Sequence, residues 1–314
     1  MHRYWIMRLF NRVNYFSKGR VGRSETKRTL LQFVFAAMAN PHFKGFLDGR
    51  IYNGSSKAVC VPGLNCYSCP GAAGACPIGS LQAIIGSPKY TISLYVMGLL
   101  MLFGTLLGRL VCGFLCVFGL VQDLLFKIPT PKFKLSKAVD SKLRYLKYVV
   151  LIVMVIALPM FLTNRIGIAP PYFCKYLCPA GTLEAAFPLL AKNPFLRETI
   201  GHIFFIKLSI LIVVVLSSIF IYRPFCKYLC PLGAIYGLFN KLGIFRLEFE
   251  QSKCVDCGLC EKSCKMDIDV RNKLNSAECI RCGACIKACN HGALDSLIGL
   301  KTKGSFVNKS EKSS

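Results

Sequence analysis

The stretch HIFFIKLSILIVVVLSSIFIYRPFCKYLCPLG (202–233) joins a long apolar segment to a cysteine motif. A helix of about 20 mostly apolar residues is long enough to cross the hydrocarbon of a bilayer, and the first part of this stretch meets that length. The motif that follows, C-K-Y-L-C-P, also occurs earlier in PPYFCKYLCPAG (170–181). The chain therefore carries one cysteine motif twice, with an apolar segment of membrane length between the copies.

The composition indicates an integral membrane protein with polar extensions. Of the 314 residues, 54% are hydrophobic and 18% are charged, and the mean hydropathy is +0.47. A formal charge of +25 could indicate nucleic-acid binding, but no fold motif for it accompanies the charge. Lys and Arg gather beside the apolar segments, where they set topology and meet anionic head groups. We therefore expect membrane lipid, and no nucleic acid, among the partners.

Four segments are candidates for membrane spans. Three of them approach or reach the length that a spanning helix needs, and the fourth, TLLQFVFAAMAN (29–40), is too short on this criterion alone. The three longer segments are residues 90–108, 146–162 and 202–222.

The distribution of basic residues indicates whether the short segment 29–40 crosses the membrane. Residues 1–28 hold eight Lys or Arg and residues 119–147 hold seven, against three in 48–89 and four in 163–201. By the positive-inside rule both basic segments should be cytoplasmic, which requires two crossings before residue 119. We therefore expect an α-helical integral membrane protein with four transmembrane helices and both termini cytoplasmic, in the cytoplasmic (inner) membrane of a prokaryote.

The same patterns divide the chain into four parts. A lysine- and serine-rich tail with few apolar residues cannot bury enough surface to fold. The predicted parts are a basic cytoplasmic arm (1–28), a membrane domain with cysteine motifs at both faces (29–246), a cysteine-dense domain (247–298) and a disordered tail (299–314).

The cysteine-dense domain contains the spacing C-x2-C-x2-C-x3-C twice. This is the spacing of bacterial two-cluster ferredoxins, in which three close cysteines bind one 4Fe–4S cluster and the fourth binds the other. A zinc ribbon, the alternative, usually has two C-x2-C pairs and a longer spacer. The usual proline after the fourth cysteine is replaced by Lys265 and Asn290. The predicted ligands are Cys254, Cys257, Cys260 and Cys289 for the first cluster, and Cys279, Cys282, Cys285 and Cys264 for the second.

Three further cysteine pairs have the spacing C-x3-C. Residues i and i+4 lie on one face of a helix, so each pair should present two thiols on the same side. A following proline should stop the helix there. One such pair is often two small buried hydrophobes, but three pairs at the ends of apolar segments favour iron ligation. The pairs are Cys112/Cys116, which Val117 follows in place of proline, Cys174/Cys178 and Cys226/Cys230.

The predicted topology assigns these pairs to two membrane clusters. The first and third pairs follow the second and fourth spans, so they should together bind an inner 4Fe–4S cluster at the cytoplasmic side. The middle pair should lie on the opposite side, with the Gly/Pro-rich loop after the first span, and bind an outer cluster. The cysteines left over would form a disulfide or complete a further cluster. The candidate outer ligands are Cys174, Cys178 and two or three of Cys66, Cys69 and Cys76, with Cys60 as the spare.

At these residues the chain resembles the NapH-type polyferredoxins, to which NosR-like membrane parts and YccM-like electron-transport proteins are related. The family pattern is four membrane helices, C-x3-C-P motifs after the second and fourth, and a C-terminal two-cluster ferredoxin. The resemblance implies electron transfer in anaerobic-type respiration, commonly with quinol oxidation. The loop CVPGLNCYSCPGAAGACPIGSLQ (60–82) and the pair Cys174/Cys178 go beyond the family core. The pattern falls on Cys112/Cys116, Cys226/Cys230 and Cys254–Cys289, within residues 29–298.

Three functions agree with these expectations. The first is a transmembrane conduit that carries electrons from a soluble ferredoxin or reductase in the cytoplasm to an extracytoplasmic redox protein, and the extra outer cysteines favour it. The second is a quinol dehydrogenase subunit between the quinone pool and a partner reductase, and the third is an accessory protein for redox maturation or sensing. No C-x-x-C-H or G-x-G-x-x-G sequence indicates c-type haem or a dinucleotide. In each case the chain is a redox component of an oxidoreductase system rather than a stand-alone enzyme.

Overall fold

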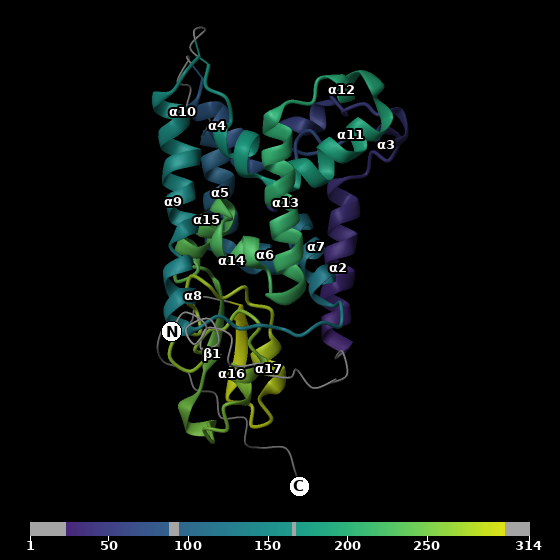
Figure 1. Cartoon of the computed structure of the whole chain (residues 1–314). Coiled ribbons are helices and arrows are strands. Elements are labelled where there is room, and N and C mark those ends of the chain that lie inside the picture. The colour runs from purple at the N-terminus through teal and green to yellow at the C-terminus, as the bar shows by residue number, and fades with distance from the viewer. Residues whose placement is uncertain (1–22, 88–93, 165–167, 299–314) are drawn as a thin grey trace, which may run out of the picture.

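The computed structural model describes residues 23–87, 94–164 and 168–298 of the chain. It has two parts, a bundle of helices and a small domain that contains the C-terminal cysteine motifs, drawn at the lower end of Figure 1. The predicted tail and most of the predicted N-terminal arm lie outside the described residues. Helices and a ferredoxin-like domain are the two features that the sequence predicted.

Within the described residues, two helices are long and apolar enough to cross a membrane. They are Lys137–Phe161, with a mean hydropathy of 1.9, and α13 (His202–Phe220), with a mean hydropathy of 2.7. In their most apolar windows only 28% and 17% of the residues are buried, so their apolar side chains form outer surface. The first of them consists of α8 (Lys137–Leu143), α9 (Leu146–Val150), the π-helical segment η2 (Leu151–Ala157) and α10 (Leu158–Phe161).

The other two predicted spans contain shorter helices. The segment 29–40 belongs to α2 (Arg23–Ala39), whose 17 residues rise about 25 Å, against about 30 Å of hydrocarbon. The segment 90–108 contains α5 (Leu94–Leu106), and its first four residues lie outside the described ones. Two of the four predicted spans are thus helices of membrane length, and the four-span topology stays a prediction.

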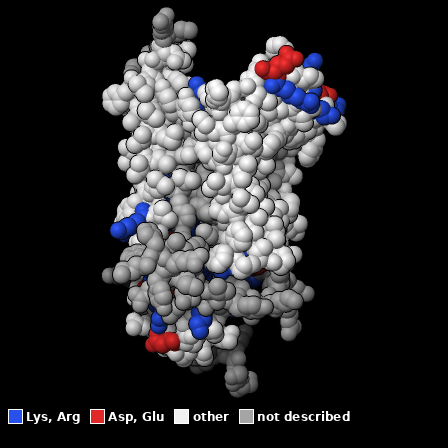
Figure 2. Space-filling model, in the orientation of Figure 1, with Lys and Arg blue, Asp and Glu red and all other residues white. Residues whose placement is uncertain are grey.

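Charged side chains are unevenly placed on the surface. Figure 2 shows one face on which Lys, Arg, Asp and Glu gather towards the two ends, while uncharged surface fills most of the region between them. Exposed apolar side chains of α13, among them Phe205, Val213 and Leu216, belong to the helical bundle. A broad uncharged zone of this kind is what lipid tails would cover.

Short helices connect the longer ones. Figure 1 shows α3, α4, α11 and α12 at the end of the bundle away from the small domain, and α6 and α14 nearer to it. The connecting elements are α3 (Lys44–Asp48), η1 (Ser55–Ala58), α4 (Pro77–Ile85), α6 (Leu110–Phe114), α7 (Val117–Phe126), η3 (Phe173–Leu177), η4 (Gly181–Ala186), α11 (Phe187–Lys192), α12 (Pro194–Glu198), α14 (Pro224–Tyr228) and α15 (Pro231–Phe239).

The small domain is closed by a two-stranded antiparallel sheet. Strand β1 (Phe245–Phe249) pairs with β2 (Leu294–Ile298), with Phe249 opposite Leu294. The sheet joins the two ends of the cysteine-dense segment and begins two residues before the predicted boundary at residue 247. Between the strands lie η5 (Gln251–Lys253), α16 (Leu259–Ser263) and α17 (Ala284–Ala288).

A buried ion-pair group fixes the small domain to the bundle. Glu278 of the small domain accepts from Arg109, with Nη1 to Oε2 at 2.8 Å, and also pairs with Lys147. Arg281 donates to the carbonyl of Leu107 at 2.9 Å, and Asn240 donates to that of Cys279 at 2.7 Å. Burial alone would raise the pKa of Glu278, but Arg109 and Lys147 hold that pKa below its ordinary value.

We predict that Glu278→Ala destabilises the attachment of the small domain. The substitution leaves the cations of Arg109 and Lys147 buried without their carboxylate, and loss of one partner from a buried ion pair costs about 3–5 kcal/mol. The midpoint of thermal unfolding of the purified protein in detergent should fall clearly. Glu250→Ala, which breaks an exposed pair with Lys253 at 2.7 Å, is the control and should leave the midpoint in place. Equal midpoints for the two variants would contradict the role of Glu278.

Candidate metal centres

The two cysteine motifs of the small domain share one local structure. Asp256 and Arg281, which precede the second cysteine of each motif, have φ angles of 52° and 53°. Gly258 and Gly283, which follow it, have φ angles of 68° and 73° and precede α16 and α17. Left-handed backbone at these two points wraps each motif tightly, and glycine adopts it without steric cost.

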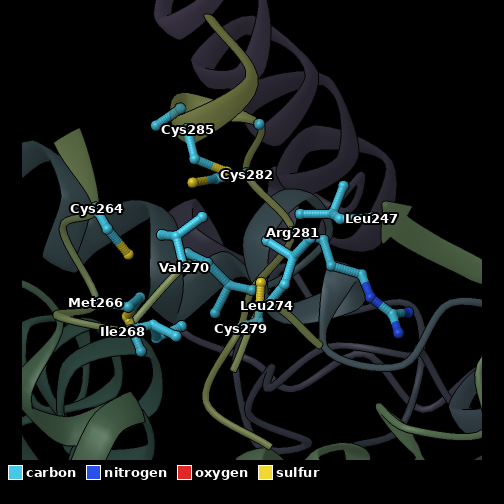
Figure 3. A pocket seen from close by; sticks show the side chains of 13 residues that line it. Leu247, Cys264, Met266, Ile268, Val270, Leu274, Cys279, Arg281, Cys282 and Cys285 are labelled. Atoms are coloured by element: carbon cyan, nitrogen blue, oxygen red, sulfur yellow. The ribbon is translucent and has the colours of Figure 1, made fainter. Parts of the chain in front are cut away.

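Each motif borders a cavity that is lined by four thiols. The first cavity lies at the motif that begins with Cys254 and the second at the motif that begins with Cys279. Apolar side chains, among them Met266, Ile268 and Val270, fill much of the remaining wall of the second cavity (Figure 3). The thiols are Cys254, Cys257, Cys260 and Cys289 in the first cavity, and Cys264, Cys279, Cys282 and Cys285 in the second.

This lining fits a 4Fe–4S cluster in each cavity. Four thiols are the ligand set that such clusters take, and the fourth thiol of each set comes from the other motif, as the spacing predicts. Within the described residues, no three Cys, His, Asp or Glu side chains meet as ligands of a single metal ion. The fit therefore depends on the four-thiol lining and not on a preformed mononuclear site.

A third group of four thiols lies in the bundle, where α6 and α14 approach the small domain. The largest electrostatic influences on the thiol of Cys230 come from the three other thiols of this group, so the four lie close together. All four side chains are buried. The group consists of Cys112, Cys116, Cys226 and Cys230, which are the predicted inner ligands.

The inner cysteine pairs differ from the predicted shared helix face. Cys112 lies in α6, but Cys116 has extended backbone (φ −89°, ψ 118°) and caps the start of α7. Cys230 has the same role for α15, and Pro231 does not merely stop a helix but opens the next one. An N-cap residue must leave the helical region so that its side chain can accept an N–H, and proline suits the first helical position because the N–H there has no partner.

Backbone and side-chain N–H groups point at the inner sulfurs. The backbone N–H of Gly119 donates to Cys116 Sγ at 3.3 Å, and that of Gly233 donates to Cys230 Sγ at 3.4 Å. The side chain of Gln122 donates from Nε2 to the Sγ of Cys226 at 3.0 Å. Such donors stabilise negative charge on sulfur, which is what thiolate ligands of a cluster carry.

Two buried arginines cross over the inner group. Arg109 donates from Nη2 to the carbonyl of Cys226 at 3.0 Å, while Arg223 donates from Nη1 to the carbonyl of Cys112. Each arginine precedes one cysteine pair and holds the backbone of the other. Arg223 also pairs with Asp123, which in turn pairs with Arg28 at 3.0 Å.

The loop that follows α3 reaches down to the inner group. A Cβ added to Gly63 would lie 2.9 Å from the Cα of Cys116, and the backbone N–H of Leu64 lies against the sulfur of that cysteine. The hydroxyl of Tyr236 donates to the carbonyl of Pro62 at 2.8 Å. Cys66 comes two residues after Leu64, at most about 7 Å of extended chain. Cys66 is therefore close to the inner group.

A fourth set of thiols lies around η3 and η4. Burial is the largest cause that raises the pKa of Cys178, and the nearby thiols of Cys174, Cys66 and Cys76 raise this pKa further by smaller amounts. The Cβ position of Gly181 is 3.7 Å from Cys66 Sγ. The structure thus brings four of the candidate outer ligands together.

Two polar side chains support this outer group. Gln82 donates from Nε2 to the Sγ of Cys174 at 3.4 Å and accepts from the backbone N–H of Phe173 at 2.9 Å. The carboxylate of Glu184 accepts from the N–H of Cys66 at 2.7 Å. Burial raises the pKa of Glu184 to about 7, against the lowering effect of that N–H.

The two remaining cysteines of the loop have other neighbours. Cys60 donates to the hydroxyl of Ser80 at 3.4 Å and forms a β-bridge with Ala75. Cys69 is buried, the backbone N–H groups of Gly71 and Ala72 lie against its thiol, and the charges of Glu184 and then Lys57 act on it.

The sequence interpretation missed the polar residues that support the thiols. They bind across segments that are far apart in the chain, as when Arg109 reaches Cys226, so no local pattern indicates the contact. One signal was present, because Gln82 and Gln122 both stand six residues after a cysteine. The supporting residues are Gln82, Arg109, Gln122, Asp123, Glu184, Arg223, Tyr236 and Glu278.

Family comparisons match both parts of the chain. The 4Fe-4S binding domain family matches three segments, residues 90–136, 147–193 and 203–250, and each holds one C-x3-C pair. The 4Fe-4S dicluster domain family matches residues 245–301. Together with the thiol groups, these matches show that the chain binds several 4Fe–4S clusters.

Individual relatives cover part of the chain. Uncharacterized protein MJ0750 of Methanocaldococcus jannaschii is 35% identical over 54% of this chain and 64% of its own length. Uncharacterized protein MJ0749 of the same organism is 32% identical over 54% of this chain and 56% of its own length. The putative electron transport protein YccM of Escherichia coli is 28% identical over 52% of this chain and 43% of its own length. The chain thus spans less than two thirds of the length of these curated relatives. No solved structure matches it.

We predict that Gln122→Met lowers the reduction potential of the inner cluster. Methionine has a similar shape but lacks the N–H that donates to Cys226 Sγ, and hydrogen bonds to sulfur favour the more negative, reduced cluster. A redox titration followed by electron paramagnetic resonance measures the shift. The clusters of the small domain serve as the internal control and should keep their potentials. An unchanged inner potential would show that this hydrogen bond does not act on the cluster.

Proposed function

Because the chain belongs to the NapH/NosR/YccM-like family of 4Fe–4S polyferredoxins, we propose that it conducts electrons across a membrane. In this proposal electrons pass through four clusters, two in the small domain, one at the inner thiols and one at the outer thiols. The donor is a soluble ferredoxin or reductase in the cytoplasm, and the acceptor is an extracytoplasmic redox protein. The chain is then a redox component of a larger oxidoreductase system.

One observation carries the proposal, which is that the segments that hold successive thiol groups lie against one another. Ile280, between two cysteines of the second cavity, lies against the inner motif, and a Cβ on Gly113 would be 2.7 Å from its carbonyl oxygen. Leu64 touches the inner Cys116, and Cys66 of the outer group follows two residues later. Each cluster would therefore have the next one as its neighbour.

The solvent-facing end of this series is the first cavity of the small domain. Among its four thiols, Cys257 is exposed, so a soluble partner can approach this cluster closely. Exposed lysines lie beside the cavity, Lys253 on its wall, Lys262 on α16 and Lys287 on α17. Their positive charge would steer an acidic ferredoxin to this surface.

The proposed topology has four spans with both termini in the cytoplasm of a prokaryote. Its support is the pair of long apolar helices with exposed side chains and the excess of Lys and Arg in residues 1–28 and 119–147. Helices α2 and α5 would supply the other crossings. The small domain contacts the same end of the bundle as the basic segment that leads into α9, and so would lie in the cytoplasm.

We predict that Cys230→Ala stops electron transfer across a vesicle membrane. The substitution removes a thiol from the inner group, so the inner cluster is lost from the middle of the series. Vesicles that contain the protein are loaded with an oxidant, and reduced ferredoxin is added outside. The rate of oxidant loss should fall to that of protein-free vesicles.

Two further measurements complete this experiment. The spectrum of the two small-domain clusters should persist in Cys230→Ala, because their eight thiols are untouched. Transfer at the wild-type rate would refute the conduit. A wild-type protein that oxidises quinol analogues but does not accept electrons from reduced ferredoxin would instead identify a quinol dehydrogenase subunit.

A further inference from the structure

The three C-x3-C segments share a pattern that extends beyond their cysteines. In each, the second cysteine precedes a helix, a glycine follows three residues later and a large polar or aromatic residue follows six residues later. The seven-residue stretches are CVFGLVQ (116–122), CPAGTLE (178–184) and CPLGAIY (230–236).

The loop before α5 contains the same pattern a fourth time. It is CPIGSLQ (76–82), in which Cys76 caps the start of α4 and Pro77 opens that helix. The N–H groups of Gly79 and Gly181 lie against Cys76 and Cys178, as those of Gly119 and Gly233 do in the inner group. Matches to the 4Fe-4S binding domain family begin at residue 90 and so leave this segment out.

The two glutamines of the pattern make identical contacts. Gln122 donates to Cys226 Sγ at 3.0 Å and accepts from the N–H of Phe225 at 3.2 Å. Gln82 donates to Cys174 Sγ at 3.4 Å and accepts from the N–H of Phe173 at 2.9 Å. The helix after Cys76 is therefore related to the motif at 173–178 as the helix after Cys116 is related to the motif at 225–230.

This correspondence restricts the outer ligands. The inner group takes two thiols from each of its two segments, so an equivalent outer group takes Cys76 and one earlier cysteine of the loop. Cys66 meets this condition, since its sulfur lies 3.7 Å from the Cβ position of Gly181 in η4. Cys60 instead donates to Ser80 at 3.4 Å, and the thiols with the largest effect on Cys178 are those of Cys174, Cys66 and Cys76.

We propose that residues 66–82 are a fourth, diverged copy of the cluster-binding segment, and that Cys66, Cys76, Cys174 and Cys178 hold the outer 4Fe–4S cluster. Cys60 and Cys69 are then not ligands. The assignment deepens the proposed conduit and rests on its outer cluster. It also makes the membrane part a set of four segments, in which the first and third bind one cluster and the second and fourth bind the other.

The test is an iron and acid-labile sulfide count on the full chain, purified without oxygen. Wild-type protein should hold about 16 iron atoms in four clusters. Cys66→Ala and Cys76→Ala should each lose about four, because alanine offers no ligand to replace the thiol. The matched controls Cys69→Ala and Cys60→Ala lie in the same loop and should lose none.

The double variant Cys60→Ala/Cys69→Ala decides the assignment even where the ligand variants fail to accumulate. Its retention of about 16 iron atoms would support the four ligands, and a loss of about four would overturn them. Loss of iron in Cys69→Ala with full retention in Cys66→Ala would also overturn them, while leaving the conduit intact. If the wild-type protein held only about 12 iron atoms, it would have no outer cluster, and the proposed conduit would lack its outer end.

Discussion

Two buried guanidinium groups hold the centre of this molecule together. Arg109 and Arg223 are 0% exposed, and each reaches from the start of one inner cysteine pair to the backbone of the other. A buried cation is tolerated when its charge is paired with a carboxylate. Arg109 finds its carboxylate in Glu278 of the small domain, and Arg223 finds its own in Asp123 of α7. The pairing of the two inner segments and the docking of the small domain are thus one connected arrangement.

The second recurring device is a cysteine at the start of a helix. A helix N-terminus presents N–H groups that have no partner within the helix, and these groups favour negative charge on a nearby sulfur. Cys116 and Cys230 accept such N–H groups at 3.3 and 3.4 Å. Each of these cysteines therefore accepts one of the N–H groups at the start of the helix that follows it. Irregular backbone deep inside a membrane protein is stable only where protein, rather than lipid, surrounds it in this way.

Local spacing predicted the parts of the fold that local chemistry determines. The two C-x2-C-x2-C-x3-C motifs predicted the four-thiol cavities, because cysteines that are so close in sequence must bind a common centre. Hydropathy found α13 and the continuous segment of α9, η2 and α10, but it could not foresee that α8 continues that helix back to Lys137. The inner pairs do not share one helix face, because an N-cap role for Cys116 and Cys230 requires extended backbone. The two thiols of each pair nevertheless meet in the same group, as predicted. Contacts such as Gln82 with Cys174 join residues 92 positions apart, and pairwise spacing contains no information on them.

The loop between α3 and α4 extends deep into the helical bundle and lies against the inner thiol group. Gly63 allows the loop backbone to lie against Leu115, where a Cβ would be 2.6 Å from the carbonyl oxygen of that residue. This close approach brings the outer thiols towards the inner ones and leaves Tyr236, fully buried, beside both. The two copies of the repeated motif therefore support neighbouring sites of the helical bundle.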